Sequence, residues 1–143
     1  MNYEQSIDYI HSIPKFRRPL GNANLEKLLT QLDNPQKKLK FIHIAGTNGK
    51  GSTAAMTAEI LKKSGFKTGL FTSPYLEVFN ERIRINGENI TDNDLAEYVT
   101  RVKAIMEENN ALVSEFAFIT AVSFLYFYEK QCDIVVLEVG MGG

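Results

Sequence analysis

The sequence has one cysteine and no long hydrophobic run, and each shortage excludes a class of protein. A lone Cys132 forms neither an internal disulfide nor a cysteine-cluster metal site. It stands beside a predicted buried strand, which favours a packed thiol over a reactive one. No apolar stretch approaches the roughly 20 residues of a membrane-spanning helix. Residues 1–4 also lack the pattern of a signal peptide. We therefore expect a cytoplasmic protein with no membrane partner.

An excess of charge of either sign is also missing. The chain carries 16 Lys and Arg against 17 Asp and Glu, a formal net charge of −1. Such a balance creates no overall field that would attract nucleic acid, so we expect no nucleic-acid partner. The length of 143 residues and a hydrophobic share of 44% suit one globular domain with a buried core.

A glycine-rich loop lies between an alternating apolar run and a helical pattern. Residues 40–45 predict a strand, and residues 52–64 predict a helix that ends at Gly65. The loop and the start of the helix contain Gly46, Thr47, Asn48, Gly49, Lys50, Gly51, Ser52 and Thr53. A strand, a glycine loop and a helix form a phosphate-binding loop, in which backbone N–H groups and the helix N-terminus face the phosphates. Lys50 then neutralises the β- and γ-phosphates of a nucleotide, and a hydroxyl inside the helix holds Mg²⁺.

Two further segments are predicted to meet this loop at one edge of a parallel sheet. Residues 67–72 predict a strand that the intervening helix joins to the first in a βαβ unit. The apolar run 134–137 predicts a strand buried on both faces, and Glu138 follows it. Because ligands bind at the carboxyl ends of parallel strands, we expect Ser73 and Glu138 near Lys50. A carboxylate in that position favours a metal ion as its partner; the alternative is a Glu that faces solvent.

The remaining periodic segments predict helices on both sides of this sheet. They cover residues 3–13, a short stretch around residues 25–32, residues 91–109 and residues 115–130. In the helix at residues 52–64, we expect Met56, Ile60 and Leu61 to face the core. Residues 79–88 predict an extended piece with an Asn-Gly turn. The predicted fold is therefore α/β, with a mostly parallel sheet flanked by helices.

A series of short blocks resembles one enzyme family, the folylpolyglutamate synthase and dihydrofolate synthase branch of the Mur ligase superfamily. The blocks lie at residues 15–16, 20–21, 34–36, 42–52, 72–74, 79–83, 120–121 and 138–143, in the order and approximate spacing of the family. Tyr75 departs from the family pattern, which usually has His there, and Ala117 stands where the family usually has Glu. The resemblance covers nearly the whole chain.

The resemblance implies an ATP-dependent, amide-forming ligase with a three-layer fold of the P-loop type. Residues 1–143 would be the N-terminal part of its ATP-binding domain, with the rest of that domain and a C-terminal domain absent. Members of the family use ATP and Mg²⁺ to convert a folate carboxylate into an acyl phosphate, which the amino group of L-glutamate attacks. Some bacterial members also use dihydropteroate. The parent would be a monomer, and the isolated chain would be inactive.

The resemblance also assigns roles to particular residues. Lys50 would be catalytic, and the loop residues 46–53 would bind ATP. The magnesium ligands would be Ser52, Ser73 and Glu138, and the substrate contacts would come from Ser73, Pro74, Tyr75, Phe79 and Arg82.

Three alternatives remain open from the residues alone. The loop is an ordinary strand-to-helix turn with a solvated lysine, or it belongs to a P-loop kinase or a GTPase-like switch. Such a switch would carry Ser or Thr directly after Lys50, where this chain has Gly51. The third alternative is a chain that binds nucleotide or folate without catalysis. Since the chain ends on a glycine loop directly after an apolar strand, we also expect the sheet to have at least one uncovered edge, which would favour self-association.

Overall fold

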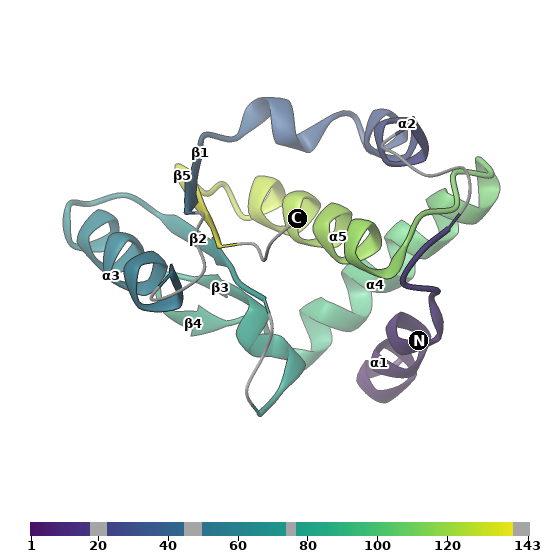
Figure 1. Ribbon diagram of the computed structural model, residues 1–143, viewed down its shortest axis with the longest axis horizontal. Coiled ribbons are helices and arrows are strands. Elements are labelled where there is room, and N and C mark those ends of the chain that lie inside the picture. Colours follow the sequence, from purple (N-terminus) through teal and green to yellow (C-terminus); the bar gives the residue numbers. More distant parts are fainter. Residues whose placement is uncertain (18–22, 45–49, 74–76, 139–143) are drawn as a thin grey trace. The chain divides into compact units, whose positions relative to one another are not determined.

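The computed structural model describes residues 1–17, 23–44, 50–73 and 77–138, with the side chains of residues 50–52 excluded. The chain divides into two compact units. Figure 1 labels their helices and strands. The first combines Met1–Lys38 with Asp92–Tyr126, and the second combines Leu39–Thr91 with Phe127–Gly143. No helix in the described ranges is both long and apolar enough to cross a membrane.

The first unit is helical, as the periodicity predicts. It holds α1 (Tyr3–Ser12), α2 (Ala23–Gln31), the 3₁₀ helix η1 (Pro35–Lys38), α4 (Asp92–Glu108) and most of α5 (Glu115–Glu129). Helix α1 begins with a capping box, in which the Gln5 N–H donates to Asn2 Oδ1 at 2.8 Å and the Asn2 N–H donates to Gln5 Oε1 at 3.0 Å. At the start of α5, the Ala117 N–H donates to Ser114 Oγ at 3.4 Å.

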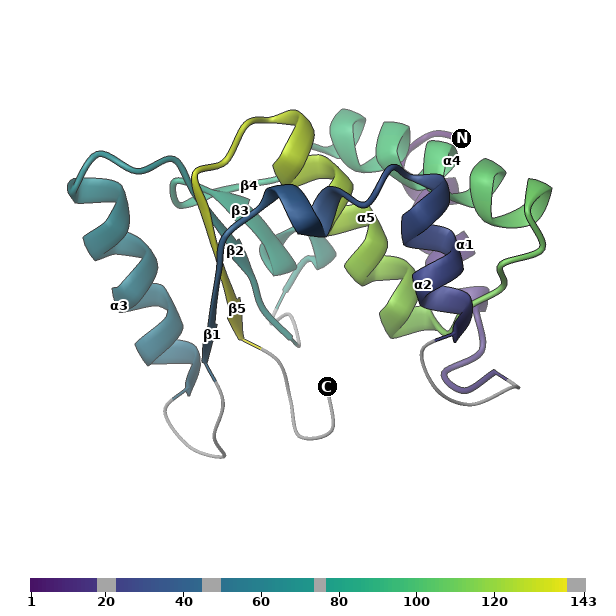
Figure 2. The ribbon, with the colours of Figure 1, turned by 90° about the horizontal axis from the view of Figure 1, so that it is seen from above.

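The second unit contains a mixed sheet, whose strands are labelled in Figure 2. Its strands are β1 (Phe41–Ile44), β2 (Thr68–Phe71), β3 (Ile83–Ile85), β4 (Glu88–Asn89) and β5 (Ile134–Glu138), and their order is β1-β5-β2-β3-β4. Strands β1 and β2 both run parallel to β5, whereas β3 is antiparallel to β2 and to β4. The predicted α/β class is therefore confirmed, and the sheet is mixed, with the parallel strands β1, β5 and β2 beside the antiparallel strand β3.

Strand β5 occupies the middle of the parallel part of the sheet. Val135 and Val136 are fully buried, as expected for a strand covered on both faces. Residues 134–137 do not themselves lie at a sheet edge, because β1 and β2 pair with β5 on its two sides. Within the described part of the chain, the edge strands are β1 and β4.

Helix α3 (Lys50–Lys63) packs on one face of the sheet through small side chains. Ala54 contacts Leu70 and Val136, and Ala58 and Leu61 pack against the same cluster. The prediction that Met56 and Ile60 face the core is wrong, since they are 65% and 63% exposed. Ala54, Ala58 and Leu61 have helical spacing, as do Met56 and Ile60. The side with the alanines faces the sheet, because small side chains allow helix and strand to approach more closely. Gly65 ends the helix with a φ of +96°, as predicted.

Strands β3 and β4 form a hairpin beside β2. Asn86 and Gly87 have φ angles of 51° and 83°, which are typical of the predicted two-residue turn. The Asn86 side chain fixes this turn, because its Oδ1 accepts a hydrogen bond from the Thr68 N–H at 2.9 Å. The expected extended piece is only partly present, since Phe79–Arg82 forms a short 3₁₀ helix, η2.

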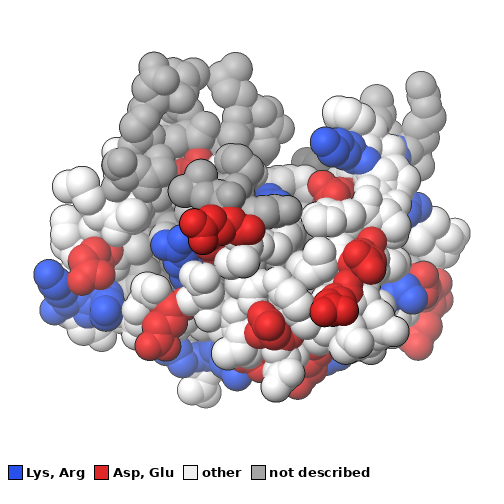
Figure 3. Space-filling view, turned by 90° about the horizontal axis from the view of Figure 1, so that it is seen from below, with Lys and Arg blue, Asp and Glu red and all other residues white. Residues whose placement is uncertain are grey.

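Acidic and basic side chains are interspersed over the described residues of the face in Figure 3. Pairs of opposite charge also lie one turn apart on helices, as with Glu59 and Lys63 at 3.7 Å and Glu97 and Arg101 at 3.5 Å. Exposed pairs of this kind contribute little to stability, about 0.5 kcal/mol or less each. They account for charged surface without implying a charged partner.

Candidate functional site

Three parallel strands end together at one edge of the sheet. Ile44, the last residue of β1, is paired with Glu138 at the end of β5, and Phe71 at the end of β2 is paired with Leu137. Ser73 follows β2, and α3 begins at Lys50 after the residues that follow β1. The predicted convergence of Ser73 and Glu138 at the carboxyl ends of parallel strands is therefore confirmed.

The Glu138 side chain is buried at this edge, with 4% of its surface exposed. Its Oε2 accepts a hydrogen bond from the Ser73 main-chain N–H at 3.1 Å. The alternative of a glutamate that faces solvent is therefore wrong. A buried carboxylate is costly unless hydrogen bonds or a cation compensate it. The Ser73 N–H supplies one such hydrogen bond, and a cation bound at this edge of the sheet would supply further compensation.

The described residues also bear on which metal this edge suits. Among them, no group of three or more His, Cys, Asp or Glu could hold a metal ion. Magnesium does not require such a group, because it is commonly bound by one or two carboxylates together with waters and phosphate oxygens. A single buried carboxylate beside a serine fits that mode of binding and does not fit a zinc site, which takes several nitrogen or sulfur ligands.

Much of the predicted loop lies outside the described residues. This holds for Gly46, Thr47, Asn48 and Gly49, and also for Pro74 and Tyr75 in the second loop. The backbone of Lys50, Gly51 and Ser52 forms the start of α3, two residues before the predicted start. Thr53 is exposed on the same turn. Their contacts with nucleotide or metal stay predictions.

The two remaining predicted substrate residues, Phe79 and Arg82, are buried, with 4% and 9% of their surfaces exposed. The Arg82 guanidinium lies 5.9 Å from the centre of the Phe71 ring and 5.3 Å from that of the Phe79 ring. Its Nε donates to the Thr72 carbonyl at 3.3 Å. Substrate contact by either residue stays a prediction. The hydrogen bond to Thr72 connects Arg82 to the residue before Ser73.

Glu81 is a residue of this region to which the sequence assigned no role. Its carboxylate accepts hydrogen bonds from the Glu77 N–H at 3.2 Å and from the Val78 N–H at 3.3 Å. These two donors precede η2, and a Glu three residues after the N-cap, here Val78, is a familiar capping signal. The sequence contains that signal, but it can be recognised only if residues 79–82 are predicted to be helical, and they were predicted to be extended.

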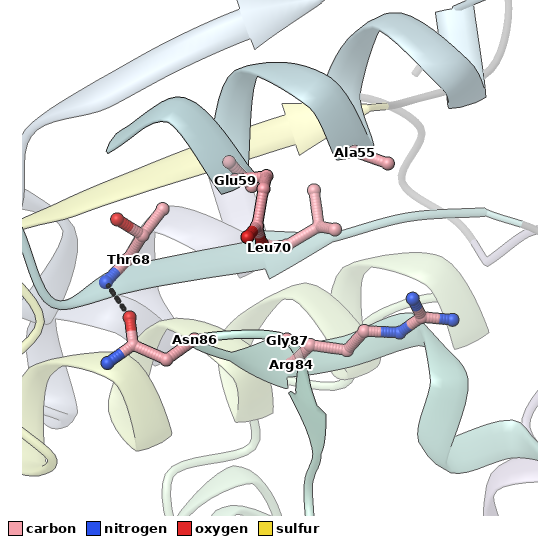
Figure 4. Close-up of a pocket in the computed structure, with 8 residues that line it drawn as sticks. Ala55, Glu59, Thr68, Leu70, Arg84, Asn86 and Gly87 are labelled. Carbon is pink, nitrogen blue, oxygen red and sulfur yellow. Dashed lines mark hydrogen bonds between the residues drawn. The ribbon is translucent and has the colours of Figure 1, made fainter. Parts of the chain in front are cut away.

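A separate small hollow lies on the α3 side of the sheet (Figure 4). It has a volume of about 150 Å³ and is lined by Ala55, Ala58, Glu59, Thr68, Leu70, Arg84, Asn86 and Gly87. Figure 4 shows the Arg84 guanidinium directed away from Glu59, and its Nε donates to the Glu81 carbonyl at 3.0 Å. The hollow is smaller than the roughly 300–1,000 Å³ of typical ligand pockets, and we assign it no role.

Comparison with known proteins finds close relatives along the whole chain, although no family model matches. The chain is 43% identical over 148 residues to a folylpolyglutamate synthase of Lacticaseibacillus casei, spanning 100% of this chain and 35% of the relative. It is 39% identical over 146 residues to a dihydrofolate synthase/folylpolyglutamate synthase of Bacillus subtilis (strain 168), spanning 99% and 34%. A solved FPGS–AMPPCP–folate complex superposes with a TM-score of 0.92 at 42% identity, over 100% of this chain and 36% of that one. The chain therefore spans about a third of the length of these relatives.

Proposed function

Because the chain is related over its whole length to the folylpolyglutamate and dihydrofolate synthases, we propose that it supplies the ATP and magnesium site of a ligase that adds L-glutamate to folate. The observation that carries the proposal is the buried Glu138 carboxylate, which accepts the Ser73 N–H at the carboxyl edge of the parallel strands. A solved relative in complex with AMPPCP, an ATP analogue, and folate supports the choice of ligands.

The proposed reaction has two steps. A carboxylate oxygen of folate attacks the γ-phosphorus of ATP, and the bond between that phosphorus and the β–γ bridging oxygen breaks. ADP departs, and the folate carboxylate has become an acyl phosphate. The amino group of L-glutamate then attacks the acyl carbon, inorganic phosphate leaves and a proton is released with the new amide. Dihydropteroate is an alternative acceptor in the same chemistry, as the double name of the Bacillus subtilis relative suggests.

The residues of this chain have distinct tasks in the proposal. Lys50 and the backbone of residues 46–53 hold the phosphates in line with the acceptor carboxylate, and Lys50 offsets charge on the transferring phosphoryl group. Ser52, Ser73 and Glu138 would hold Mg²⁺, which neutralises phosphate charge when it is bound. Pro74, Tyr75, Phe79 and Arg82 would contact folate together with Ser73, and Phe79 and Arg82 are buried.

Several further assignments belong to this proposal. We propose that residues 1–143 form the N-terminal part of the ATP-binding domain, that the parent is a cytoplasmic monomer, and that these residues alone form no glutamyl product. The single buried cysteine is compatible with a reducing compartment. The span of about a third of the relatives' length supports the lack of activity.

Titration calorimetry of the chain with Mg·ATP tests the central assignment. We expect binding of Mg·ATP that weakens at least about tenfold in Lys50→Ala, because one full charge on the phosphates is lost. Lys63→Ala is the matched control, since the Lys63 side chain is 76% exposed at the other end of α3, where its Nζ lies 3.7 Å from Glu59 Oε1. Equal affinities for wild type and Lys50→Ala would contradict the nucleotide assignment.

A further inference from the structure

Two successive residues, Glu81 and Arg82, hold the backbone of residues 72 and 77–78 by hydrogen bonds. On the strand side, Arg82 Nε donates to the Thr72 carbonyl at 3.3 Å, and the Thr72 N–H donates to the Arg82 carbonyl at 2.9 Å. On the other side, the Glu81 carboxylate accepts the N–H groups of Glu77 and Val78. All of these residues lie in the second unit.

The Arg82 side chain is itself held in place. Its guanidinium lies over the Phe71 and Phe79 rings at 5.9 Å and 5.3 Å, and only 9% of the residue is exposed. Aromatic faces attract a cation and restrict the orientation of a planar guanidinium. The hydrogen bond to the Thr72 carbonyl therefore starts from a fixed donor, which limits the freedom of the peptide that leads into Ser73.

Ser73 is the point where this arrangement reaches the candidate site. The Ser73 N–H and the Thr72 carbonyl belong to the same peptide group. The carbonyl accepts a hydrogen bond from Arg82 Nε, and the N–H donates to Glu138 Oε2 at 3.1 Å. One peptide group thus receives a hydrogen bond from Arg82 on its oxygen and gives one to Glu138 from its nitrogen. The orientation of that peptide plane couples the buried guanidinium to the buried carboxylate.

From these contacts we propose that Glu81 and Arg82 form a loop clamp that positions the Ser73 N–H against Glu138 and so orients the carboxylate for Mg²⁺. Arg82 is in this view a positioning residue, which acts through the Thr72–Ser73 peptide and does not touch the nucleotide. Glu81 holds the N–H groups of Glu77 and Val78. The metal part of the inference rests on the proposed function, whereas the hydrogen-bond part does not.

Two measurements on the full chain separate these parts. The first is hydrogen exchange of the Ser73 amide by NMR, which reports the bond to Glu138 without any ligand. The second is the Mg²⁺ concentration that gives half-maximal binding of ATP, compared with ATP binding without the metal. The variants are Arg82→Gln, Arg82→Lys and Glu81→Gln. Arg82→Lys keeps the charge between the rings if the neutral variant fails to fold.

The matched control is Arg101→Lys. Arg101 is also stacked on an aromatic ring, 5.1 Å from the centre of Tyr98, but it lies on α4 in the first unit. We expect exchange at Ser73 to accelerate at least about tenfold and the Mg²⁺ requirement to rise severalfold in both Arg82 variants. Glu81→Gln should give a smaller effect of the same sign, since the amide oxygen still accepts one hydrogen bond. Arg101→Lys should change neither quantity.

Each result decides part of the inference. Unchanged exchange at Ser73 in folded Arg82→Lys would overturn the clamp. Faster exchange with an unchanged Mg²⁺ requirement would reduce the clamp to a structural role and overturn its link to the metal. A wild-type chain that binds no Mg·ATP would contradict the proposed function, while the exchange rates of Ser73 would still decide whether the clamp exists.

Discussion

The backbone of Gly69 in β2 lies directly against the ring of Phe127, in the last turn of α5. A Cβ atom added at residue 69 would come within 2.8 Å of Phe127 Cδ1 and 2.9 Å of Cε1, closer than real Cβ contacts. Phe127 is fully buried, so its ring has little room to move. Glycine at residue 69 is therefore required by packing, and not by an unusual backbone angle.

We predict that Gly69→Ala lowers the free energy of unfolding by about 1–3 kcal/mol, as for other overpacked cores. Urea unfolding followed by circular dichroism measures the loss. Phe127→Leu removes part of the ring, so the double variant should be less destabilised than the sum of the two single variants. Additive effects would show that the two residues do not interact as described.

Glu138→Gln should raise the Mg²⁺ concentration needed for ATP binding by roughly tenfold, because one negative ligand is lost. Binding of ATP without the metal should change much less. Fluorescent nucleotide titrations at a series of Mg²⁺ concentrations measure both. Glu88→Gln is the control, since Glu88 is exposed in β4. An unchanged magnesium titration in Glu138→Gln would leave Glu138 with a structural role only.

The exposed side of α3 leads to a third prediction. Met56→Gln and Ile60→Gln should each change the free energy of unfolding by no more than about 0.5 kcal/mol, since both side chains are largely exposed. Leu70→Ala, in the cluster under α3, should cost about 2–5 kcal/mol. Denaturant unfolding of the three variants gives the comparison. A large loss in Ile60→Gln would mean that α3 presents its other side to the sheet.

Burial raises the pKa of the Cys132 thiol from 9.0 to about 11, with the charge of Lys67 opposing the shift. At pH 8 the thiolate fraction should be about 100-fold lower than in an unfolded chain. We predict a correspondingly slow reaction with a disulfide reagent, compared with the chain in urea. Equal rates in the two conditions would contradict the burial of this thiol.

The same shift sets the sign of a pH dependence. Between pH 9 and 11 the unfolded thiol loses its proton while the folded thiol keeps it, so deprotonation stabilises the unfolded state relative to the folded one. The contribution of Cys132 to stability is therefore complete below about pH 9 and is lost as the pH rises through 11. Cys132→Ala should flatten the stability profile in this alkaline range, which urea midpoints at successive pH values would reveal.

The sequence by itself determined the helices, most strands and the meeting of Ser73 with Glu138. Local periodicity is enough for the elements, because a helix or a strand repeats its apolar side chains at a characteristic spacing. The convergence of the two residues followed from a rule of parallel sheets, whose carboxyl ends share one edge. The end of the apolar run at residue 137, together with this rule, was therefore sufficient to predict that Glu138 lies at the carboxyl edge of the sheet.

Tertiary structure alone decided the order of the strands and the contacts made by side chains from distant segments. The insertion of β5 between β1 and β2 depends on pairing across 94 residues of chain (Phe41 with Val135) and 66 residues (Thr68 with Ile134), for which local pattern has no signal. Met56 and Ala54 belong to two sides of α3 with the same helical spacing. The side with the small Ala54 faces the sheet because helix and strand pack closely there, which the sequence does not reveal. Arg82 could not be recognised as buried from its own neighbours, because a guanidinium becomes a stable core group only when two rings and a carbonyl are brought around it.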